Sequence, residues 1–253
     1  MFKRLLFSMI SFLYFSTNTF AHDKSILIFY CGITMVKPIT EMAKIIEKKH
    51  NCEIKISQGG SKDLYDALKF SQKGDLYLPG SDSYRKNNLK DGFLLDSKYI
   101  GYNQAALFVQ KGNPLHIQGL DDLIRQDLSV ILCDPNSGSI GRMTKKSLVT
   151  YKDEAFFYKV FDNASQIGTD SRNLNKALIE KKADLTINWR ATAFWPENNQ
   201  HIDVLELPEE IASKKKLVIN LLSFSQHKEI ARDFINFAAS KEGQAIMKKY
   251  GFL

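Results

Sequence analysis

The chain has 253 residues, of which 44% are hydrophobic and 25% are charged, and its formal net charge is +7. This is the composition of a globular protein, long enough for one large or two modest domains. The mild basic excess suits either acidic ligands or a solvated surface. No dense basic stretch is interleaved with aromatic residues, so we expect no nucleic-acid binding.

The first 21 residues form a segment of their own. Lys3 and Arg4 precede an apolar run over residues 5–15, and small and polar residues follow up to Ala21. This order is typical of a secretory signal peptide. The apolar run is short for a membrane span, and a retained N-terminal anchor is the alternative. We therefore expect a periplasmic protein whose mature chain begins near His22. The residue directly after the predicted cleavage site is His22 and not a cysteine, so we expect no lipoprotein.

Short apolar strands alternate with helices from residue 25 onward. The strands are predicted over 25–30, 52–57 and 74–80. Between the first two, apolar residues recur at helical spacing from Val36 to Ile46, with Pro38 in the first turn, where its missing N–H costs nothing. A second helix is predicted over 61–73. This alternation predicts a parallel sheet covered by helices.

The same order returns in the second half of the chain. A strand is predicted over 128–135, followed by a loop over 136–151. Residues 169–190 are predicted to form a loop, a helix and a strand. The C-terminal residues, from about Ile230 to Tyr250, carry apolar residues at helical spacing.

Two extended segments, 99–110 and 216–224, are predicted to cross between two lobes. The predicted fold class is therefore α/β: two Rossmann-like lobes with mixed sheets, joined by a two-crossing hinge. The first lobe takes residues 22–103 and 205–253, and the second takes residues 104–204.

The cysteines and histidines argue against a metal site or a redox centre. The three cysteines are Cys31, Cys52 and Cys133, an odd count that leaves at least one thiol unpaired. There is no CxxC motif, and the five histidines are scattered. We therefore expect no cofactor. Cys31 and Cys133 each end the first strand of a lobe, and we favour small buried hydrophobic residues over thiols that touch a ligand.

Five junctions between strands and helices share one chemistry. They carry glycines, hydroxyl residues or both, in the sequences YCGIT, SQGGS, CDPNSGSIG, GTDSRN and INWRAT. In open α/β sheets, ligands bind at the carboxyl ends of the strands, and helix N-termini favour anions. Each junction alone is explained as well by helix capping, with Ser61, Ser139 and Ser171 as the caps. Together they predict an anion site that both lobes share.

The order of these motifs resembles that of periplasmic solute-binding proteins of the molybdate-binding type, with the class II fold. GGSKDLYDALKFSQKGDLYLPGS is similar to that family's glycine-serine loop, helix and third strand, and GYNQAALFVQKGNP to its first crossing. CDPNSGSIG resembles its Asp-Pro loop. A later helix and strand of the family are similar to NLNKALIEKKADLTINWRATA. The family's C-terminal helix is similar to SKEGQAIMKKYGF.

The resemblance implies a monomeric protein that captures a small oxyanion between its lobes, without chemistry, for the permease of an ABC transporter at the inner membrane. The alternative receiver is a sensor kinase. Hydroxyls and backbone N–H groups of the loops would hold the anion, with molybdate or tungstate as the first expectation. Carried over to this sequence, the implied ligand-binding residues are Thr34, Gly60, Ser61, Ser137, Gly138, Ser139, Ser171 and Trp189. To these we add Arg172 and Arg190, whose charges flank the loops.

Three departures from the family pattern leave the anion open. The first loop has Cys31, Gly32 and Ile33 where the family usually has small or hydroxyl residues. Trp189 stands where the family has a tyrosine, which removes one hydroxyl donor. Three arginines, Arg142, Arg172 and Arg190, flank the predicted loops, and arginine binds carboxylate or phosphate with paired hydrogen bonds. A phosphate- or carboxylate-bearing metabolite is therefore the alternative ligand. A periplasmic hydrolase is less favoured, because the sequence has no HExxH, GxSxG or phosphate-loop motif.

Overall fold

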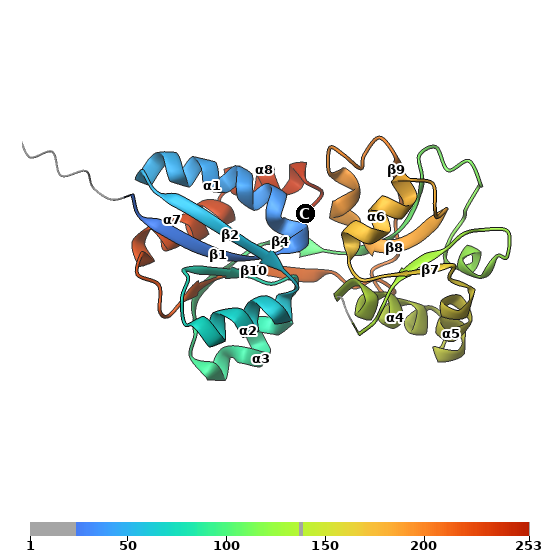
Figure 1. The fold of residues 1–253 in the computed structure, drawn as a ribbon, viewed down its shortest axis with the longest axis horizontal. Helices are drawn as coiled ribbons and strands as arrows, with labels where there is room; N and C mark the ends of the chain where they lie inside the picture. The colour runs from blue at the N-terminus through green and yellow to red at the C-terminus, as the bar shows by residue number, and fades with distance from the viewer. Residues whose placement is uncertain (1–23, 137–138, 253) are drawn as a thin grey trace, which may run out of the picture.

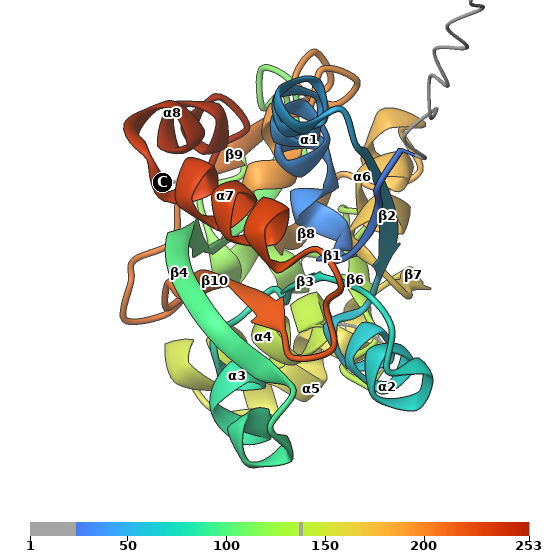
Figure 2. The ribbon, with the colours of Figure 1, turned by 90° about the vertical axis from the view of Figure 1, so that its left-hand side faces the viewer.

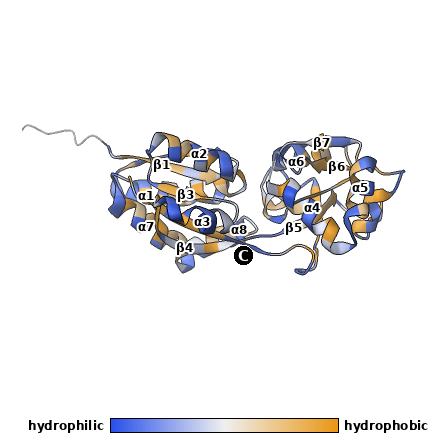
Figure 3. Cartoon of the chain, turned by 90° about the horizontal axis from the view of Figure 1, so that it is seen from below, coloured by the Kyte–Doolittle hydropathy of each residue, from blue (hydrophilic) through white to orange (hydrophobic). Residues whose placement is uncertain are grey.

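The computed structural model describes residues 24–136 and 139–252. The chain forms two lobes that lie end to end, each with a β-sheet and helices packed against it (Figure 1). This confirms the predicted fold class. Seen from below, the lobes are separate bodies joined by extended chain, each with its own hydrophobic residues (Figure 3). The predicted signal peptide, Ser137 and Gly138 lie outside the described residues.

The first lobe contains a mixed five-stranded sheet in the order β2-β1-β3-β10-β4. β1 pairs in parallel with β2 and β3, as the alternation of strands and helices predicted, and β10 is antiparallel to both β3 and β4. The mixed character arises from β10 alone, which brings the chain back into the lobe and so runs opposite to the other four strands. The strands are β1 Ile26–Gly32, β2 Glu53–Gly59, β3 Leu76–Leu78, β4 Leu94–Asn103 and β10 Lys215–Leu222.

Helices cover both faces of this sheet (Figure 1, Figure 2). On one face the predicted apolar stripe of α1 is buried, and Phe29 of β1 meets Phe234 of α7 edge to face, with ring centroids 5.2 Å apart. The C-terminal helical region is divided at Ser240, whose hydroxyl accepts the N–H of Gly243 and so starts a new helix. The helices are α1 Val36–His50, α7 Lys228–Ala239 and α8 Lys241–Lys249 on this face, and α2 Ser61–Ser71 and α3 Ser83–Asn88 on the other.

The second lobe contains an antiparallel sheet, β8-β5-β9, and the parallel pair β6-β7. A bridge from Val130 to Leu185 connects the pair to β8. The strands are β5 Ala105–Gln110, β6 Ile131–Cys133, β7 Gln166–Gly168, β8 Leu185–Trp189 and β9 Ile202–Leu205. The helices are α4 Ser139–Tyr151, α5 Glu154–Asn163 and α6 Ser171–Ile179. Short 3-10 helices occupy Ile33–Met35, Leu89–Asp91, Leu120–Ile124 and Arg190–Phe194.

The predicted loop over 136–151 is wrong, because residues from Ser139 onward form helix α4. Its buried face combines the apolar Ile140, Met143 and Leu148 with the polar Thr144 and Ser147. These buried hydroxyl residues interrupt the apolar stripe by which a helix is recognised in a sequence. Tertiary packing, rather than a continuous hydrophobic face, determines this helix.

The two crossings differ from each other. The first is direct, since β4 ends at Asn103 and β5 begins at Ala105. The second predicted crossing, 216–224, instead lies largely in β10 of the first sheet, so the chain returns within residues 206–214. The predicted boundary before residue 205 falls inside β9, and Ala212 still packs in the core of the second lobe.

The three cysteines are buried, Cys31 and Cys52 in the core of the first lobe and Cys133 in that of the second. None of them lines a cavity between the lobes in the described part of the chain. Within residues 24–136 and 139–252, no helix has the length and apolarity that a membrane crossing requires.

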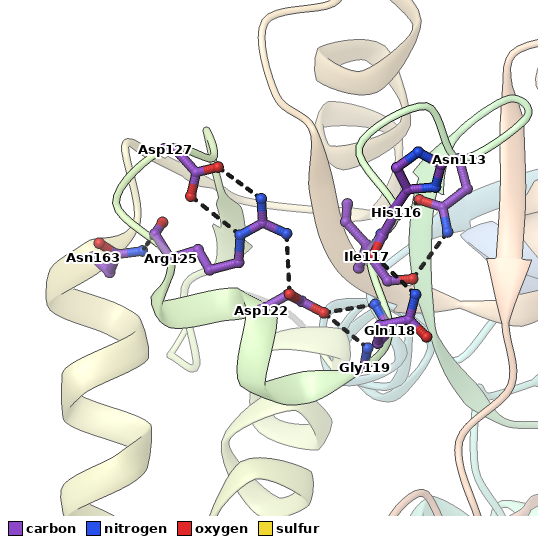
Figure 4. A network of polar contacts seen from close by, with 9 residues as sticks. All are labelled: Asn113, His116, Ile117, Gln118, Gly119, Asp122, Arg125, Asp127 and Asn163. Atoms are coloured by element: carbon purple, nitrogen blue, oxygen red, sulfur yellow. Dashed lines mark hydrogen bonds and ion pairs between the residues drawn. The ribbon is translucent and has the colours of Figure 1, made fainter.

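A carboxylate organises the turn that leads into the 3-10 helix Leu120–Ile124 (Figure 4). Asp122 accepts the backbone N–H groups of Gln118 and Gly119 at 2.6 and 3.0 Å, and the Arg125 guanidinium at 3.2 Å. Burial raises the pKa of Asp122, but these hydrogen bonds outweigh burial and the pKa lies below its ordinary value. The charged carboxylate therefore stabilises the folded state.

We expect Asp122→Ala to lower the free energy of unfolding at pH 7 by about 1–3 kcal/mol, because two backbone donors lose a charged acceptor. Since the folded pKa is depressed, this contribution is present above the unfolded pKa of about 3.9 and is lost as the pH falls through the folded pKa. Urea unfolding at pH 7 and at pH 3 measures it. A deficit as large at pH 3 as at pH 7 would contradict the assignment.

Candidate functional site

A cavity of about 500 Å³ lies between the lobes. Most of the predicted ligand-binding residues that the structure describes line it. They are Thr34, Gly60, Ser61, Ser139, Ser171, Arg172 and Trp189. Residues from both lobes therefore meet at one place, although they are more than 150 positions apart at the extremes.

The fold brings these residues together at strand ends. β1 and β2 run in parallel and in register, with Gly32 opposite Gly59, so the loops that follow them leave the sheet at the same edge. Packing around Gly32 is close, because a Cβ at this position would lie 2.5 Å from Cε of Met35, the end of a flexible side chain, and 3.3 Å from the carbonyl oxygen of Leu78.

Helices from both lobes begin at this cavity. The residues that line it include the first turns or caps of α1, α2, α4 and α6. The caps of α1 and α2, Met35 and Gly60, make no side-chain hydrogen bond to the helix among the described residues. N–H groups in a first turn have no intrahelical partner and carry a partial positive charge. The first-lobe wall of the cavity is therefore built to donate hydrogen bonds.

Two hydrogen bonds hold Ser61 in this wall. Its hydroxyl accepts the N–H of Gly80 at 2.9 Å, and its carbonyl accepts the hydroxyl of Tyr77 at 2.7 Å. Burial raises the pKa of Tyr77, so this phenol stays a donor. Ser61 is the first helical residue of α2, and Gly60 occupies the cap position, so capping does not explain the serine.

Asn103, at the end of β4, contributes an acceptor that the sequence reasoning missed. Its Nδ2 donates to the Thr34 hydroxyl at 3.4 Å, and the Thr34 hydroxyl donates to Sδ of Met35 at 2.9 Å. Asn103 Oδ1 is buried and has no hydrogen-bond partner among the described residues. An unpaired acceptor in a cavity wall favours a ligand that brings a donor.

Two carboxylates also line the cavity, and both were missed. Asp63 lies in the first turn of α2, and Asp170 caps α6 by accepting the N–H groups of Arg172 and Asn173 at 2.8 and 3.1 Å. Burial raises the pKa of Asp170. The hydrogen bonds from the Arg172 side chain and from these N–H groups outweigh burial, so the pKa lies below its ordinary value. Asp170, and not the predicted Ser171, is thus the cap of α6. The sequence contained a signal for this, because aspartate directly before a helix is a strong N-cap residue.

A buried amide pair supports the second-lobe wall. Asn188 donates to the carbonyl of Ser171 at 3.0 Å and to Oδ1 of Asn175 at 2.8 Å, and its own Oδ1 accepts the N–H of Trp189 at 2.8 Å. These contacts join the end of β8 to the start of α6. They fix where Ser171 and Trp189 stand in the cavity.

The structure does not bring Arg190 into this cavity. Its Nε pairs with Glu206 at 2.6 Å, its Nη1 donates to the carbonyl of Gly251 at 3.3 Å, and its guanidinium lies 4.6 Å from the Phe194 ring centroid. These contacts join the lobes near the return segment. Arg190 therefore has partners at the hinge, whereas Arg172 stays at the cavity and pairs with Asp170 at 3.0 Å.

Close packing at Gly141 positions the start of α4. A Cβ at this glycine would lie 2.2 Å from the carbonyl oxygen of Asp134 and 2.8 Å from that of Cys133. Only a residue without a Cβ lets the first turn of α4 approach the end of β6 so closely. Ser139 and Ile140, which line the cavity, depend on this approach.

The cavity is lined by hydrogen-bonding and charged groups. Among the described residues that line it there is no histidine or cysteine. No group of three or more metal-ligating side chains was found in the described part of the chain. A ligand in this cavity would meet backbone N–H donors, hydroxyls, amides, Arg172 and two carboxylates.

A family model described as "Bacterial extracellular solute-binding protein" matches residues 27–253. Among curated proteins, the chain is 21% identical to the "Putative ABC transporter substrate-binding lipoprotein YvgL" of Bacillus subtilis (strain 168), over 93% of this chain and 89% of that protein.

Solved structures show the same fold. The periplasmic molybdate-binding protein of Azotobacter vinelandii superimposes with a TM-score of 0.75 at 12% identity, over 90% of this chain and 98% of that one. PEB3 with bound L-phospholactate, a protein of Campylobacter jejuni, superimposes with a TM-score of 0.70 at 18% identity, over 89% and 98%. The match to two-lobe binding proteins agrees with the architecture described above.

We expect Gly141→Ala to destabilise the protein by about 1–3 kcal/mol, because the added methyl group overlaps backbone oxygens that cannot move away freely. Thermal or urea unfolding measures this change. Gly119→Ala is the matched control, since a Cβ at Gly119 meets no atom within 4 Å and its φ of 173° is ordinary extended backbone. Equal stability of the two variants would show that α4 does not depend on the close approach.

Proposed function

The chain belongs to the family of bacterial extracellular solute-binding proteins, and from this premise we propose that it captures a small anion between its two lobes. The capture is reversible, and the solute passes to an ABC transporter. The observation that carries the proposal is that the starts of α1 and α2, whose caps make no side-chain hydrogen bond, line one cavity together with residues of the second lobe. Such an arrangement favours negative charge without needing a full positive charge.

The nature of the anion follows from the rest of the lining. The A. vinelandii neighbour is a molybdate-binding protein, and the PEB3 structure holds L-phospholactate. A bare oxyanion offers only acceptors at neutral pH, and Asp63, Asp170 and Asn103 Oδ1 are acceptors too. A cavity of about 500 Å³ is also in the size range that takes organic ligands. These observations favour an organic anion that carries donors, with molybdate or tungstate as the second candidate.

The same observations support binding without turnover. A hydrolase on this architecture would need a base next to a hydroxyl nucleophile. Ser61 instead pairs with the backbone N–H of Gly80, and Thr34 with the sulfur of Met35. These partners position the hydroxyls but do not activate them.

We propose a periplasmic protein that acts as a monomer and docks on a permease at the inner membrane. The sequence of residues 1–21 supports export, and the description of the B. subtilis relative supports a transporter. A sensor kinase is the alternative receiver, since one cavity serves either system.

We expect an anion that binds this cavity to raise the melting temperature. At a concentration of 100 times Kd the gain is about 2.7 kcal/mol, which corresponds to roughly 5–10 °C for a protein of this size. The screen contains molybdate, tungstate, sulfate, citrate and 3-phosphoglycerate, with a neutral sugar as the negative control.

Two results would contradict the proposal. One is the absence of a shift with any anion in the screen. The other is saturable hydrolysis of a phosphoester that Ser61→Ala abolishes, since this would make the protein an enzyme. Ser61→Ala is itself expected to weaken anion binding about tenfold, through loss of a hydroxyl and of the acceptor that fixes Gly80.

A further inference from the structure

A second cavity, of about 520 Å³, adjoins the first. Gly80, Ser139 and Trp189 line both cavities. The second cavity continues along the residues that follow β3 in the first lobe, along α4 in the second lobe, and along Lys214 and Lys215 at the start of β10. The two cavities therefore adjoin at Gly80, Ser139 and Trp189. We call the second one the basic cavity.

The basic cavity contains cations without anionic partners. Arg142, Lys146 and Lys215 line it, and none of them has a carboxylate partner within ion-pair distance among the described residues. Arg142 donates to the Tyr84 hydroxyl at 2.9 Å, and Lys215 donates to the Ser213 hydroxyl at 2.9 Å. Hydroxyl partners leave these positive charges uncompensated.

The other charged residues of this cavity are already paired. Asp82 binds Lys86 at 2.6 Å, and Lys214 binds Glu209 at 2.9 Å. Burial, and then the positive charge of Lys146, lower the pKa of Lys215 against the opposing effect of Asp82. Lys146 and Lys215 therefore repel each other across the cavity, from α4 and β10 respectively. An anion between them would remove this repulsion.

The first cavity has a mixed character. Hydroxyls and helix-start N–H groups line it together with Asp63, Asp170 and one cation, Arg172, which Asp170 already binds. Asp63 and the unpaired Oδ1 of Asn103 can accept hydrogen bonds from a ligand. The first cavity thus offers both donors and acceptors, whereas the uncompensated cations lie in the basic cavity.

We propose that the ligand is an organic phosphate that carries hydroxyl groups, and that its phosphate binds Arg142, Lys146 and Lys215. Its hydroxyl end lies in the first cavity and donates to Asp63 and to the unpaired Oδ1 of Asn103. A phosphate monoester carries about −1.5 to −2 charges at pH 7, which three cations accommodate better than the single charge of a carboxylate. Ser81 and Ser83, whose hydroxyls lie 2.9 Å apart at this cavity, add neutral donors.

This inference rests on the proposed function, and titration calorimetry tests it on the purified protein. The probes are fructose 6-phosphate, glycerol 3-phosphate, inorganic phosphate, fructose and molybdate. We expect an organic phosphate to bind at least about tenfold more tightly than inorganic phosphate or fructose, because only it reaches both ends of the cleft. Lys146→Gln and Lys215→Gln should each weaken its binding about tenfold.

Neighbouring lysines provide matched controls. Lys145→Gln removes a charge from the same helix, but Lys145 pairs with Glu154 at 3.5 Å and lies over Phe157. Lys216→Gln removes an exposed charge from β10 next to Lys215. Neither residue lines the basic cavity, so both variants should keep the affinity of the unmodified protein within about twofold. Circular dichroism confirms the fold of each variant.

The outcomes separate this inference from the proposed function. Wild-type affinity in Lys146→Gln and Lys215→Gln would overturn the phosphate subsite, while anion capture would stand. Tighter binding of molybdate than of either organic phosphate would do the same. If Lys145→Gln and Lys216→Gln lose as much affinity for the organic phosphate as Lys146→Gln and Lys215→Gln, general electrostatic attraction explains the binding. That result would overturn the phosphate subsite. Absence of binding by every anion would remove the proposed function as well.

Discussion

The structure depends on one property of the helix, namely that the N–H groups of its first turn have no partner within it. Parallel strands place successive helix starts at the same edge of a sheet, and here both lobes turn that edge toward each other (Figure 1). At α6 the carboxylate of Asp170 already satisfies these donors, whereas the caps of α1 and α2 make no side-chain hydrogen bond. The first lobe therefore offers the free donors.

The connection between the lobes makes the site a shared one. Asn103 lies at the end of β4, directly before the chain crosses into β5, and the side chain of Gln104 donates to the carbonyl of Leu207 on the return segment at 3.2 Å. The two crossing segments thus contact each other beside the cavity. A ligand that contacts both walls stabilises their approach by its differential affinity for that arrangement.

Two kinds of polar wall coexist between the lobes. The hydrogen bonds around Ser61 and Asn188 fix the geometry of the Ser61 hydroxyl and of Trp189. By contrast, Asn103 Oδ1 and the cations of the basic cavity lack matching partners among the described residues. Satisfied groups hold a site in shape, whereas an unsatisfied buried group such as Asn103 Oδ1 costs free energy that a complementary ligand recovers.

The sequence by itself determined the alternation of strands and helices, the parallel start of the first sheet, and the loops that carry Thr34, Ser61, Ser171 and Trp189, because periodicity and turn residues are local signals. It failed at α4, where buried Thr144 and Ser147 break the apolar stripe, and at Arg190, which pairs at the hinge. Only the tertiary structure decided which charges face the cleft. Asp63, Asp170 and Lys215 have ordinary sequence surroundings, and their role follows from which partners packing brings near and which it leaves out of reach.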